Sequence, residues 1–326
     1  MEAVSLDELD RRILYHLDLD SRQSARELAK KVRSNKDTVN YRMHRLLENK
    51  VIEGFTAHVD TARFGLSNIK TYIRFQDMDE KREKEFFAYL NSQPEVIWIV
   101  RSSGRWDALF GVWASSTFGY HQTLKKLMNK FSRNIFEKEI IHNINWFYYN
   151  RKWLMPEARE IYPIKYGGEP ETIKFSESDI QILRVLTKNA KASFIEIAKK
   201  TGQSPQNVMN RVKALEQKKV ITKYGVDLNY KKLGLVFCKT FISLHNINDN
   251  SLAAIYRFCE QEPKVFALTT TVGAWDLELE FEVGRVEEMM GVMDKLKRAF
   301  PEFIRGHDSI VITEQTRLNY VPPVKA

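Results

Sequence analysis

Two short stretches of this chain combine residue types that could bind a small zwitterion. Gly104, Trp106 and Asp107 recur in the same order and spacing 169 residues later. Each stretch lies between strand-like apolar runs, so a hairpin with a glycine turn is expected. The aspartate could receive an amino group, and nearby backbone N–H groups a carboxylate. The alternative is structural: glycine turns, aspartate caps the turn and tryptophan fills the sheet. The candidate effector-binding residues are Gly104, Trp106, Asp107, Gly273, Trp275 and Asp276.

A second group of residues is suited to contacts with DNA. Asparagine and glutamine can pair bidentately with adenine, whereas arginine and lysine favour guanine or phosphate. Such side chains occupy exposed positions of two expected helices that open at Asn35 and Ser204. Arg42 and Arg211 take equal places in these helices, where they would bind phosphate or anchor the helix. The alternative is an ordinary solvated helix face. The candidate DNA-binding residues are Lys36, Thr38, Asn40, Tyr41, Arg42, Arg45, Gln206, Asn207, Asn210, Arg211 and Lys213.

The elements that would position these residues are themselves repeated. The offset of 169 residues aligns the two halves without a gap from about residue 6 to about residue 150. Solenoid repeats span only ~20–50 residues. The repeated unit is therefore a domain or a pair of domains.

The first part of each copy predicts three short helices and a strand. Apolar residues at helical spacing mark residues 6–20, and Ser24 with Glu27 forms a capping box at the start of the second helix. The second copy repeats this box at Ser193 and Glu196. A strand follows the third helix in both copies. Three helices with a tight turn and a wing are typical of a winged helix-turn-helix. Arg33 stands where the second copy has Gly202, so the turn before the third helix is expected to differ.

The remainder of each copy alternates strands and helices in the order β-α-β-β-α-β. This order is typical of a ferredoxin-like domain, which leaves one sheet face uncovered. We expect the two uncovered faces to pair within the chain, and further homo-oligomerisation. The fold class expected is α+β, with two winged helix-turn-helix domains that are each followed by a ferredoxin-like domain.

The domain boundaries follow from these patterns and from a segment rich in proline and glycine between the copies. The aromatic residues at the start of that segment, from Trp146 to Tyr149 and at Trp153, are expected to pack onto the first sheet domain. A ligand-facing cluster is the alternative. The expected units are residues 1–62 and 175–231 for DNA binding, 66–150 and 235–320 for sensing and dimerisation, and 151–174 for the linker.

Bulk composition limits the class of protein. The chain has 326 residues, a formal net charge of +9 and 43% hydrophobic residues. A basic chain favours an acidic partner such as double-stranded DNA. Cys238 and Cys259 are far apart, which argues against a disulfide framework or a zinc site. We expect neither a signal peptide nor a membrane span, and therefore a cytoplasmic protein.

Taken in order, these motifs resemble a known family. The stretches Leu6–Leu14, Ser24–Ala29, Arg42–Leu46 and Val51-Ile52 are similar to those of the Lrp/AsnC (leucine-responsive/feast-famine) transcription regulators. The Gly-x-Trp-Asp stretches resemble the Gly-x-x-Asp hairpin of the family's ligand-sensing domain. The resemblance implies sequence-specific DNA binding, a dimerising ferredoxin-like sensor and an amino acid or other small effector. Most members carry one copy, so this chain resembles a covalent version of the usual dimer.

Charge differs between the two expected DNA-reading domains. Residues 174–232 carry a formal charge of +8, whereas residues 1–60 carry none. We therefore expect the two domains to differ in affinity or in sequence preference, and the operator to be an imperfect palindrome.

Two other functions remain open. Some sirohaem decarboxylases of haem biosynthesis are built from the same fused halves, and an enzyme of this kind should place histidine or arginine around a porphyrin-sized cavity. The histidines and arginine of the first copy at such places are not matched by histidine in the second: His58, Arg63, His121 and His142. The other alternative is an architectural DNA-binding protein without an effector. Nucleotide-binding, dinucleotide-binding, metalloprotease and hydrolase motifs are absent from the sequence, so we expect no catalysis, no cofactor and no metal.

Overall fold

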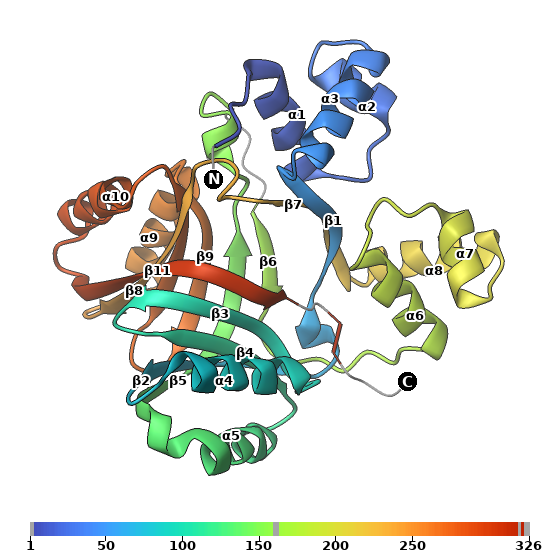
Figure 1. Cartoon of the computed structure of the whole chain (residues 1–326). Helices are drawn as coiled ribbons and strands as arrows, with labels where there is room; N and C mark the ends of the chain where they lie inside the picture. Colours follow the sequence, from blue (N-terminus) through green and yellow to red (C-terminus); the bar gives the residue numbers. More distant parts are fainter. Residues whose placement is uncertain (1–2, 159–162, 319–320, 323–326) are drawn as a thin grey trace.

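The computed structural model describes residues 3–158, 163–318 and 321–322. It is an α+β structure in which each copy contributes a winged helix-turn-helix head and half of a central barrel (Figure 1). The first head comprises α1 (Glu8–Leu19), α2 (Ala25–Lys31), α3 (Lys36–Glu48) and β1 (Ile52–Val59). The second head comprises α6 (Glu177–Leu186), α7 (Phe194–Thr201), α8 (Pro205–Gln217) and β7 (Ile221–Leu228).

Side-chain caps begin the helices of both heads, as expected. Ser24 and Glu27 form the predicted capping box at α2, and Ser193 and Glu196 form its equivalent at α7. Asn35 accepts a hydrogen bond from the backbone N–H of Thr38 at 2.8 Å, which fixes the start of α3. Each cap satisfies N–H groups that a helix leaves unpaired at its first turn.

The turn between the second and third helices is alike in the two heads, contrary to expectation. Arg33 has φ +55° and Gly202 has φ +67°, so both residues adopt the left-handed conformation. A residue with a side chain pays about 1–2 kcal/mol for this conformation. The first head therefore keeps the turn at some cost in stability.

The two ferredoxin-like halves form one closed barrel. The first half contributes β2 (Ser67–Phe75), β3 (Val96–Gly104), β4 (Ala108–Ala114) and β5 (Ile135–Tyr148), with α4 (Glu80–Ser92) and α5 (Thr117–Phe131) outside. The second half contributes β8 (Val236–Leu244), β9 (Val265–Val272), β10 (Leu277–Val283) and β11 (Ile304–Leu318), with α9 (Asp249–Gln261) and α10 (Val286–Ala299) outside.

Two long strands close the ring. The first part of β5 pairs with β2 of its own copy, and its last part pairs with β9 of the other copy. In the same way β11 pairs with β8 and then with β3. The eight strands follow the cyclic order β2-β4-β3-β11-β8-β10-β9-β5. The two uncovered faces therefore do pair within the chain, and they do so around a shared interior.

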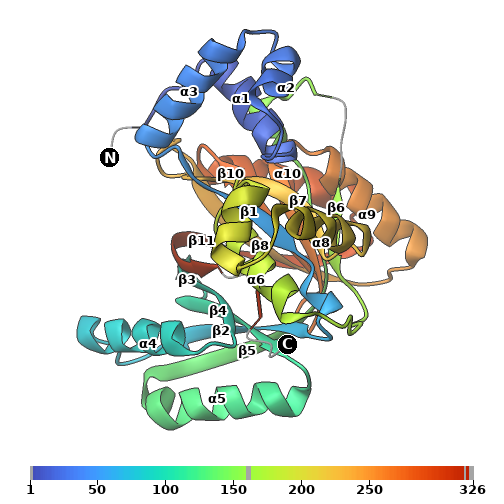
Figure 2. The same ribbon diagram turned by 90° about the vertical axis from the view of Figure 1, so that its right-hand side faces the viewer.

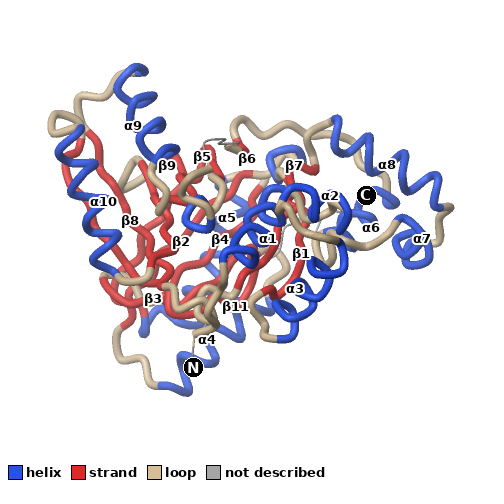
Figure 3. The backbone as a smooth tube through the Cα atoms, turned by 90° about the horizontal axis from the view of Figure 1, so that it is seen from above, coloured by secondary structure: helices blue, strands red, loops and turns tan. Residues whose placement is uncertain are grey.

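The wings of the two heads join each other. Strands β1 and β7 form an antiparallel two-stranded ribbon, with Phe55 opposite Val226. Figure 2 shows this ribbon between the heads and the barrel. Buried side chains of both heads and of the ribbon form one continuous hydrophobic core. In Figure 3, which looks down on the first head, α1–α3 lie in front of the barrel strands and α6–α8 lie to the right of them.

The segment between the copies contains ordered structure and packs differently from expectation. It carries the short helix η3 (Lys152–Leu154) and strand β6 (Ile164–Gly167), which pairs with β5. Phe147 packs on Tyr256, and Tyr149 lies in the core beneath α9 and α10. Phe147 and Tyr149 thus pack onto the second copy, because the last part of β5 pairs there. Trp146 and Tyr148 line the interior shared by both copies, and Trp153 packs against the core of the heads. Two further short helices are η1 (Thr61–Arg63) and η2 (Ser132–Asn134).

Candidate DNA-binding and ligand-binding sites

The third helix of the first head exposes part of its predicted reading face. Lys36 and Asn40 are exposed, Thr38 is half-buried, and the Tyr41 side chain is 67% exposed. Val39 and Leu46 on the opposite side are buried in the core of the head. The helix therefore presents polar and aromatic groups on a solvent-facing surface, as a reading helix requires.

Two arginines of this helix bind within their own head. Arg42 pairs with Asp7 and, at 3.3 Å, with Asp10, and Arg45 pairs with Asp10 as well. Asp10 is fully buried in α1. Hydrogen bonds from the Asp10 backbone and from Arg42 lower the pKa of Asp7. Both guanidinium groups therefore anchor α3 to α1 in the structure.

The corresponding helix of the second head, α8, is joined to α6 by one arginine, whereas two arginines join α3 to α1. Arg211 donates to Ser176 Oγ at 2.8 Å and to Asp179 Oδ1 at 3.0 Å, but Ala214 stands at the place of Arg45. Side-chain amides at the start of α8 hydrogen-bond to one another. Asn207 donates to Gln203, which precedes the helix, at 2.8 Å, and Gln206 donates to Asn210 at 3.2 Å. Lys213 is exposed further along the helix.

The two Gly-x-Trp-Asp hairpins have equivalent internal contacts. Asp107 Oδ2 accepts from the backbone N–H of Phe75 at 2.7 Å, and Asp276 Oδ2 accepts from that of Leu244 at 2.6 Å. The side chains of Trp106 and Trp275 are buried in the barrel. The tryptophan of each hairpin is therefore closed to an effector from outside, whereas the glycine, the exposed residue after it and the half-buried aspartate are accessible.

The hairpin glycines lie against the opposite copy. Gly104 has φ +127°, and a Cβ there would lie 3.1 Å from the backbone oxygen of Ser309 on β11. Gly273 has φ +155°, and a Cβ there would lie 2.5 Å from Ile141 on β5. A side chain at either position would push the copies apart at the strands that close the ring.

The barrel interior holds a row of glutamates that occurs in one copy only. Glu278, Glu280 and Glu282 alternate along β10 and are all buried. The first copy has Leu109, Gly111 and Trp113 at the equivalent positions of β4. Side chains two residues apart share a face of a strand, so the second copy lines one wall of the barrel with carboxylates.

Glu278 lies at the centre of this interior. Its carboxylate accepts from Lys70 Nζ at 2.6 Å, Lys239 Nζ at 2.8 Å and Trp275 Nε1 at 3.1 Å, and also from the Tyr72 hydroxyl. Burial alone would raise the pKa of Glu278, but the two lysines lower it well below its ordinary range. Burial lowers the pKa of Lys70 to about 8. The equivalent lysines of the two copies therefore share one carboxylate.

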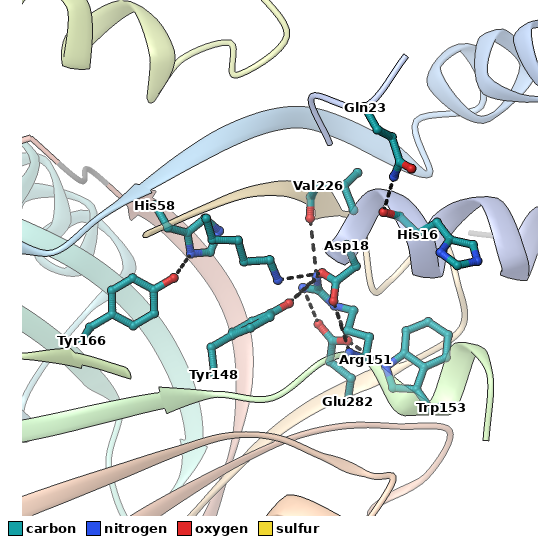
Figure 4. Close-up of polar contacts among 11 residues, drawn as sticks. His16, Asp18, Gln23, His58, Tyr148, Arg151, Trp153, Tyr166, Val226 and Glu282 are labelled. Atoms are coloured by element: carbon teal, nitrogen blue, oxygen red, sulfur yellow. Dashed lines mark hydrogen bonds and ion pairs between the residues drawn. The ribbon is translucent and has the colours of Figure 1, made fainter. Parts of the chain in front are cut away.

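A second buried ionic cluster joins the first head to the barrel (Figure 4). Arg151 binds Glu282 in a bidentate pair at 2.8 and 3.0 Å and Asp18 of α1 at 2.7 Å. Tyr148 donates to Asp18 at 2.7 Å, and Lys223 of β7 lies 3.5 Å from it. Burial lowers the pKa of Lys223 to about 8. At the position of Asp18 the second head has Thr187, so this cluster exists on one side only.

A cavity of about 1260 Å³ lies where the β1–β7 ribbon covers the mouth of the barrel. Its aromatic and charged lining residues include Trp98, Trp146, Tyr148, Tyr166, Phe237, Phe266, Lys70, Lys239, Glu280 and Arg151. Eight-stranded barrels have an interior wide enough for packed side chains or for one small ligand. The cavity is therefore a candidate ligand site that both copies, the ribbon and the connecting segment build together.

Two of the three histidines noted in the sequence line this cavity, whereas the third histidine and the arginine do not. His58 and His142 line it, and His58 Nδ1 hydrogen-bonds the Tyr166 hydroxyl at 2.9 Å. Burial lowers the pKa of His58 to about 3. Arg63 pairs with Glu171, and His121 is exposed on α5. Within the described ranges, no three His, Cys, Asp or Glu side chains form a group that could hold a metal ion.

Sequence reasoning missed the charged barrel interior. The signal is the strict alternation of Leu, Glu, Leu, Glu, Phe, Glu and Val from Leu277 to Val283. That pattern usually indicates a sheet with one apolar and one solvated face. Here the polar face points into the barrel, where lysines at equivalent places of the two copies bind it. In the part of the chain that the structure describes, no helix is both long and apolar enough to cross a membrane.

Comparisons with known proteins match both heads and the whole duplicated fold. Residues 6–47 match the model of the AsnC-type helix-turn-helix domain, and residues 175–222 match that of a winged helix-turn-helix DNA-binding domain. The chain is 52% identical over 58 residues to the HTH-type transcriptional regulator LrpA of Pyrococcus horikoshii, which covers 18% of this chain and only 41% of LrpA.

Longer matches reach beyond the heads. The chain is 34% identical over 109 residues to the proline dehydrogenase transcriptional activator of Rhodobacter capsulatus, covering 33% of this chain and 70% of that protein. The match to the transcriptional regulator AzlB of Bacillus subtilis is 28% identical and covers 46% of this chain and 96% of AzlB. A whole relative such as AzlB thus corresponds to about one of the two copies in this chain.

One solved structure covers both copies. The siroheme decarboxylase NirDL superposes with a TM-score of 0.63 over 96% of this chain and 93% of that chain, at 11% identity. At that identity the match establishes a shared fold, including the tandem arrangement.

Proposed function

Because the chain belongs to the Lrp/AsnC family of transcription regulators, we propose that it binds DNA sequence-specifically through α3 and α8 and regulates transcription as a covalent pseudo-dimer. The observation that carries the proposal is the presence of two complete winged helix-turn-helix heads, each with a polar exposed third helix. Residues 1–62 and 175–231 are the proposed reading units.

The exposed side chains of the two helices divide by chemistry. Asn40 and Tyr41 in the first head, and Gln206, Asn207 and Asn210 in the second, can reach base edges. Lys36 and Lys213 suit phosphate oxygens. Three arginines already bind carboxylates of their own heads: Arg42, Arg45 and Arg211. We propose that they hold the reading helices in place and contact phosphate only through guanidinium N–H groups that these carboxylates do not use.

The proposed operator is an imperfect palindrome. The second head is the more basic one, with a charge of +8 over residues 174–232. The first head carries Tyr41 and an additional arginine anchor where the second carries Asn210 and Ala214. Since phosphate contacts control affinity and base contacts control preference, two unlike helices read two unlike half-sites.

Selection of bound sequences from random DNA by the full chain tests the proposal. The buffer needs a fixed salt concentration, because phosphate contacts make affinity steeply salt-dependent. We expect two half-sites of unequal sequence at a fixed spacing. Uniform coverage without a motif would instead indicate an architectural DNA-binding protein, and failure to retain any DNA would refute both.

An amino acid or other small effector is proposed at the two hairpins. Asp107 and Asp276 are half-buried, and each gives one carboxylate oxygen to a backbone N–H of its own copy. Because the tryptophans point into the barrel, an effector would meet the aspartates and the backbone beside Gly104 and Gly273. Isothermal titration with a panel of amino acids tests this proposal, and absence of heat with all of them would contradict it.

The second candidate function is an enzyme that acts on a tetrapyrrole. Two observations favour it: the fold is shared with a siroheme decarboxylase across the duplication, and the cavity of about 1260 Å³ lies at the barrel mouth. A related structure of that protein is a complex with an iron-uroporphyrin III analogue. Mixing the full chain with sirohaem distinguishes the candidates. A shifted Soret band with release of CO₂ would favour the enzyme, and an unchanged spectrum favours the regulator.

A further inference from the structure

One row of side chains across the barrel differs between the copies in a way that points to a ligand. In the second copy the row runs from Lys239 on β8 through Glu280 on β10 to Ala267 on β9. In the first copy the same row runs from Lys70 on β2 through Gly111 on β4 to Trp98 on β3. Both rows lie at the same level of the barrel, because the residues are equivalent in the repeat.

In the second row, the lysine is paired with a carboxylate of the same row. Glu280 and Lys239 are opposite each other on neighbouring strands and form an ion pair at 2.9 Å. The first row contains a lysine and no carboxylate. Lys70 instead reaches Glu278 of the other copy, which Lys239 shares. An ammonium group has three N–H donors, and Lys70 uses one of them within the described ranges. The first row therefore keeps cationic donors that face the cavity.

The glycine of the first row lacks the carboxylate that Glu280 places beside Lys239, and neighbouring side chains already fill the position of a Cβ. The space that a Cβ on Gly111 would enter has Asn68 Oδ1 at 3.2 Å, Ile97 at 3.8 Å and the Trp98 Cβ at 3.9 Å. Asn68 Oδ1 is buried and has no hydrogen-bond partner among the described residues. Lys70, Gly111, Trp98 and Asn68 all line the cavity. Asn68 Oδ1 accepts hydrogen bonds and does not bind a carboxylate, so Lys70 supplies the donors for an anion at this place in the cavity.

The size and the walls of the cavity define the molecule that fits it. Its volume of about 1260 Å³ exceeds the roughly 300–1,000 Å³ of ordinary small-molecule sites. A free amino acid would fill a small part of it. Beyond Lys70 the walls are aromatic, and flat rings pack favourably against such side chains. The aromatic wall residues are Trp98, Trp146, Phe237 and Phe266.

We propose that the barrel binds one multi-ring aromatic carboxylate per chain. Its carboxylate lies beside Lys70, at the place that the Glu280 carboxylate occupies in the second copy, and its rings lie among the aromatic walls. The proposal rests on the cavity and its asymmetric rows. It extends the second candidate function, since a tetrapyrrole carboxylate is one molecule of this class, and it is independent of whether the chain regulates transcription. It is also distinct from the hairpins, which occur twice and would bind two ligands per chain.

Titration of the full chain with 1-pyrenebutyrate, with 1-pyrenebutanol as the uncharged match, tests the proposal. Pyrene fluorescence gives the affinity, and isothermal titration gives the stoichiometry. We expect one site per chain. Hydrogen bonds to a charged group contribute about 1.5–3 kcal/mol, so the butyrate should bind about 10- to 100-fold more tightly than the butanol. Equal affinities, or two sites per chain, would overturn the proposal.

A pair of substitutions at Gly111 provides the matched control. Gly111→Glu restores the carboxylate of the second copy, so we expect at least a tenfold loss of pyrenebutyrate affinity. Gly111→Ala adds only the Cβ and requires Asn68 to shift slightly, so it should keep the affinity within about threefold of the parent. Unchanged binding in Gly111→Glu, or an equal loss in both variants, contradicts the proposed position of the carboxylate.

A second variant keeps the test decisive if Gly111→Glu does not fold. Lys70→Met leaves Glu278 bound to Lys239 and removes the proposed partner of the ligand. It should abolish the preference for pyrenebutyrate over pyrenebutanol while the butanol still binds. Persistence of the preference would overturn the proposal. DNA selection with the same protein is scored separately, so failure of either proposal leaves the other standing.

Discussion

Replacement of Asp18 by asparagine should release the first head from the barrel. The Asp18 carboxylate binds Arg151 at 2.7 Å and the Tyr148 hydroxyl at 2.7 Å, and Lys223 lies 3.5 Å away. Asp18→Asn keeps the shape of the side chain but removes the carboxylate that Arg151 and Lys223 share. Glu282 remains bound to Arg151, and Asp227 still attracts Lys223. Loss of one partner from a buried ion pair costs about 3–5 kcal/mol. Since asparagine retains a hydrogen-bond acceptor, we expect about 3 kcal/mol.

Urea unfolding at pH 7 and 25 °C measures this loss. The chain has six tryptophans, so the signal of Trp153, whose indole donates to Glu282 at 3.0 Å, is obtained as the difference between each protein and its Trp153→Phe variant. We expect a first transition at lower urea in Asp18→Asn, since the cluster joins α1 to the barrel. The control is Thr187→Ala at the equivalent place of the second head, with a change within about 0.5 kcal/mol. A loss below about 1 kcal/mol in Asp18→Asn would refute the reasoning.

The pH dependence of the same pair of proteins provides a second check. Burial alone would raise the pKa of Asp18, but Lys223, Arg151 and the Tyr148 hydroxyl lower it below its ordinary value of 3.8. The stabilisation by its charge is therefore complete above pH 3.8 and is lost as the pH falls through the lower value of the folded state. The parent and Asp18→Asn should differ at pH 7 and converge in stronger acid. A constant difference down to pH 2 would show that charge is not the cause.

Further predictions concern the ligand and the reading helices. Because burial lowers the pKa of Lys70 to about 8, pyrenebutyrate affinity should fall about tenfold between pH 7 and pH 9, and a flat profile in fluorescence titrations would contradict the role of Lys70. Three neighbouring groups do not titrate between pH 7 and pH 9, because the pKa of Glu278 is lowered and those of Lys239 and Tyr72 are raised. Asn40→Ala and Asn210→Ala should each relax base preference in one half-site only, by about 1–3 kcal/mol in competition binding; a uniform loss on all sequences would indicate phosphate contacts instead.

Most of the heads could be predicted from the sequence because their signals are local. Capping at Ser24 and at Ser193 depends on residues three apart, and the apolar spacing of each helix directly reflects which face is buried. The turn at Arg33 shows the limit of this reasoning. A left-handed arginine is unfavourable by itself, but packing of α2 against α3 imposes the same turn that glycine gives the second head.

The barrel interior could not be predicted in the same way because its contacts are long-range. Nothing near Glu278 in the sequence indicates that Lys70, more than 200 residues away, binds it. The prediction for Phe147 and Tyr149 is wrong for the same reason, since β5 changes its partner from β2 to β9 along its length. The alignment of the two copies does indicate that the barrel interior is asymmetric, because Gly111 stands where the second copy has Glu280.

The ring of strands also has a consequence for how the chain is made. Strands β3 and β5 emerge from the ribosome with edges that only β11 and β9 can pair, and those strands are synthesised more than 100 residues later. Until their partner strands are synthesised, these unpaired strand edges can pair with strands of other chains. Closure of the ring is nevertheless a first-order step, since both halves are tethered at a fixed effective concentration. Refolding of the whole chain should therefore proceed at a rate that dilution does not change, whereas two separate halves would have to find each other by diffusion.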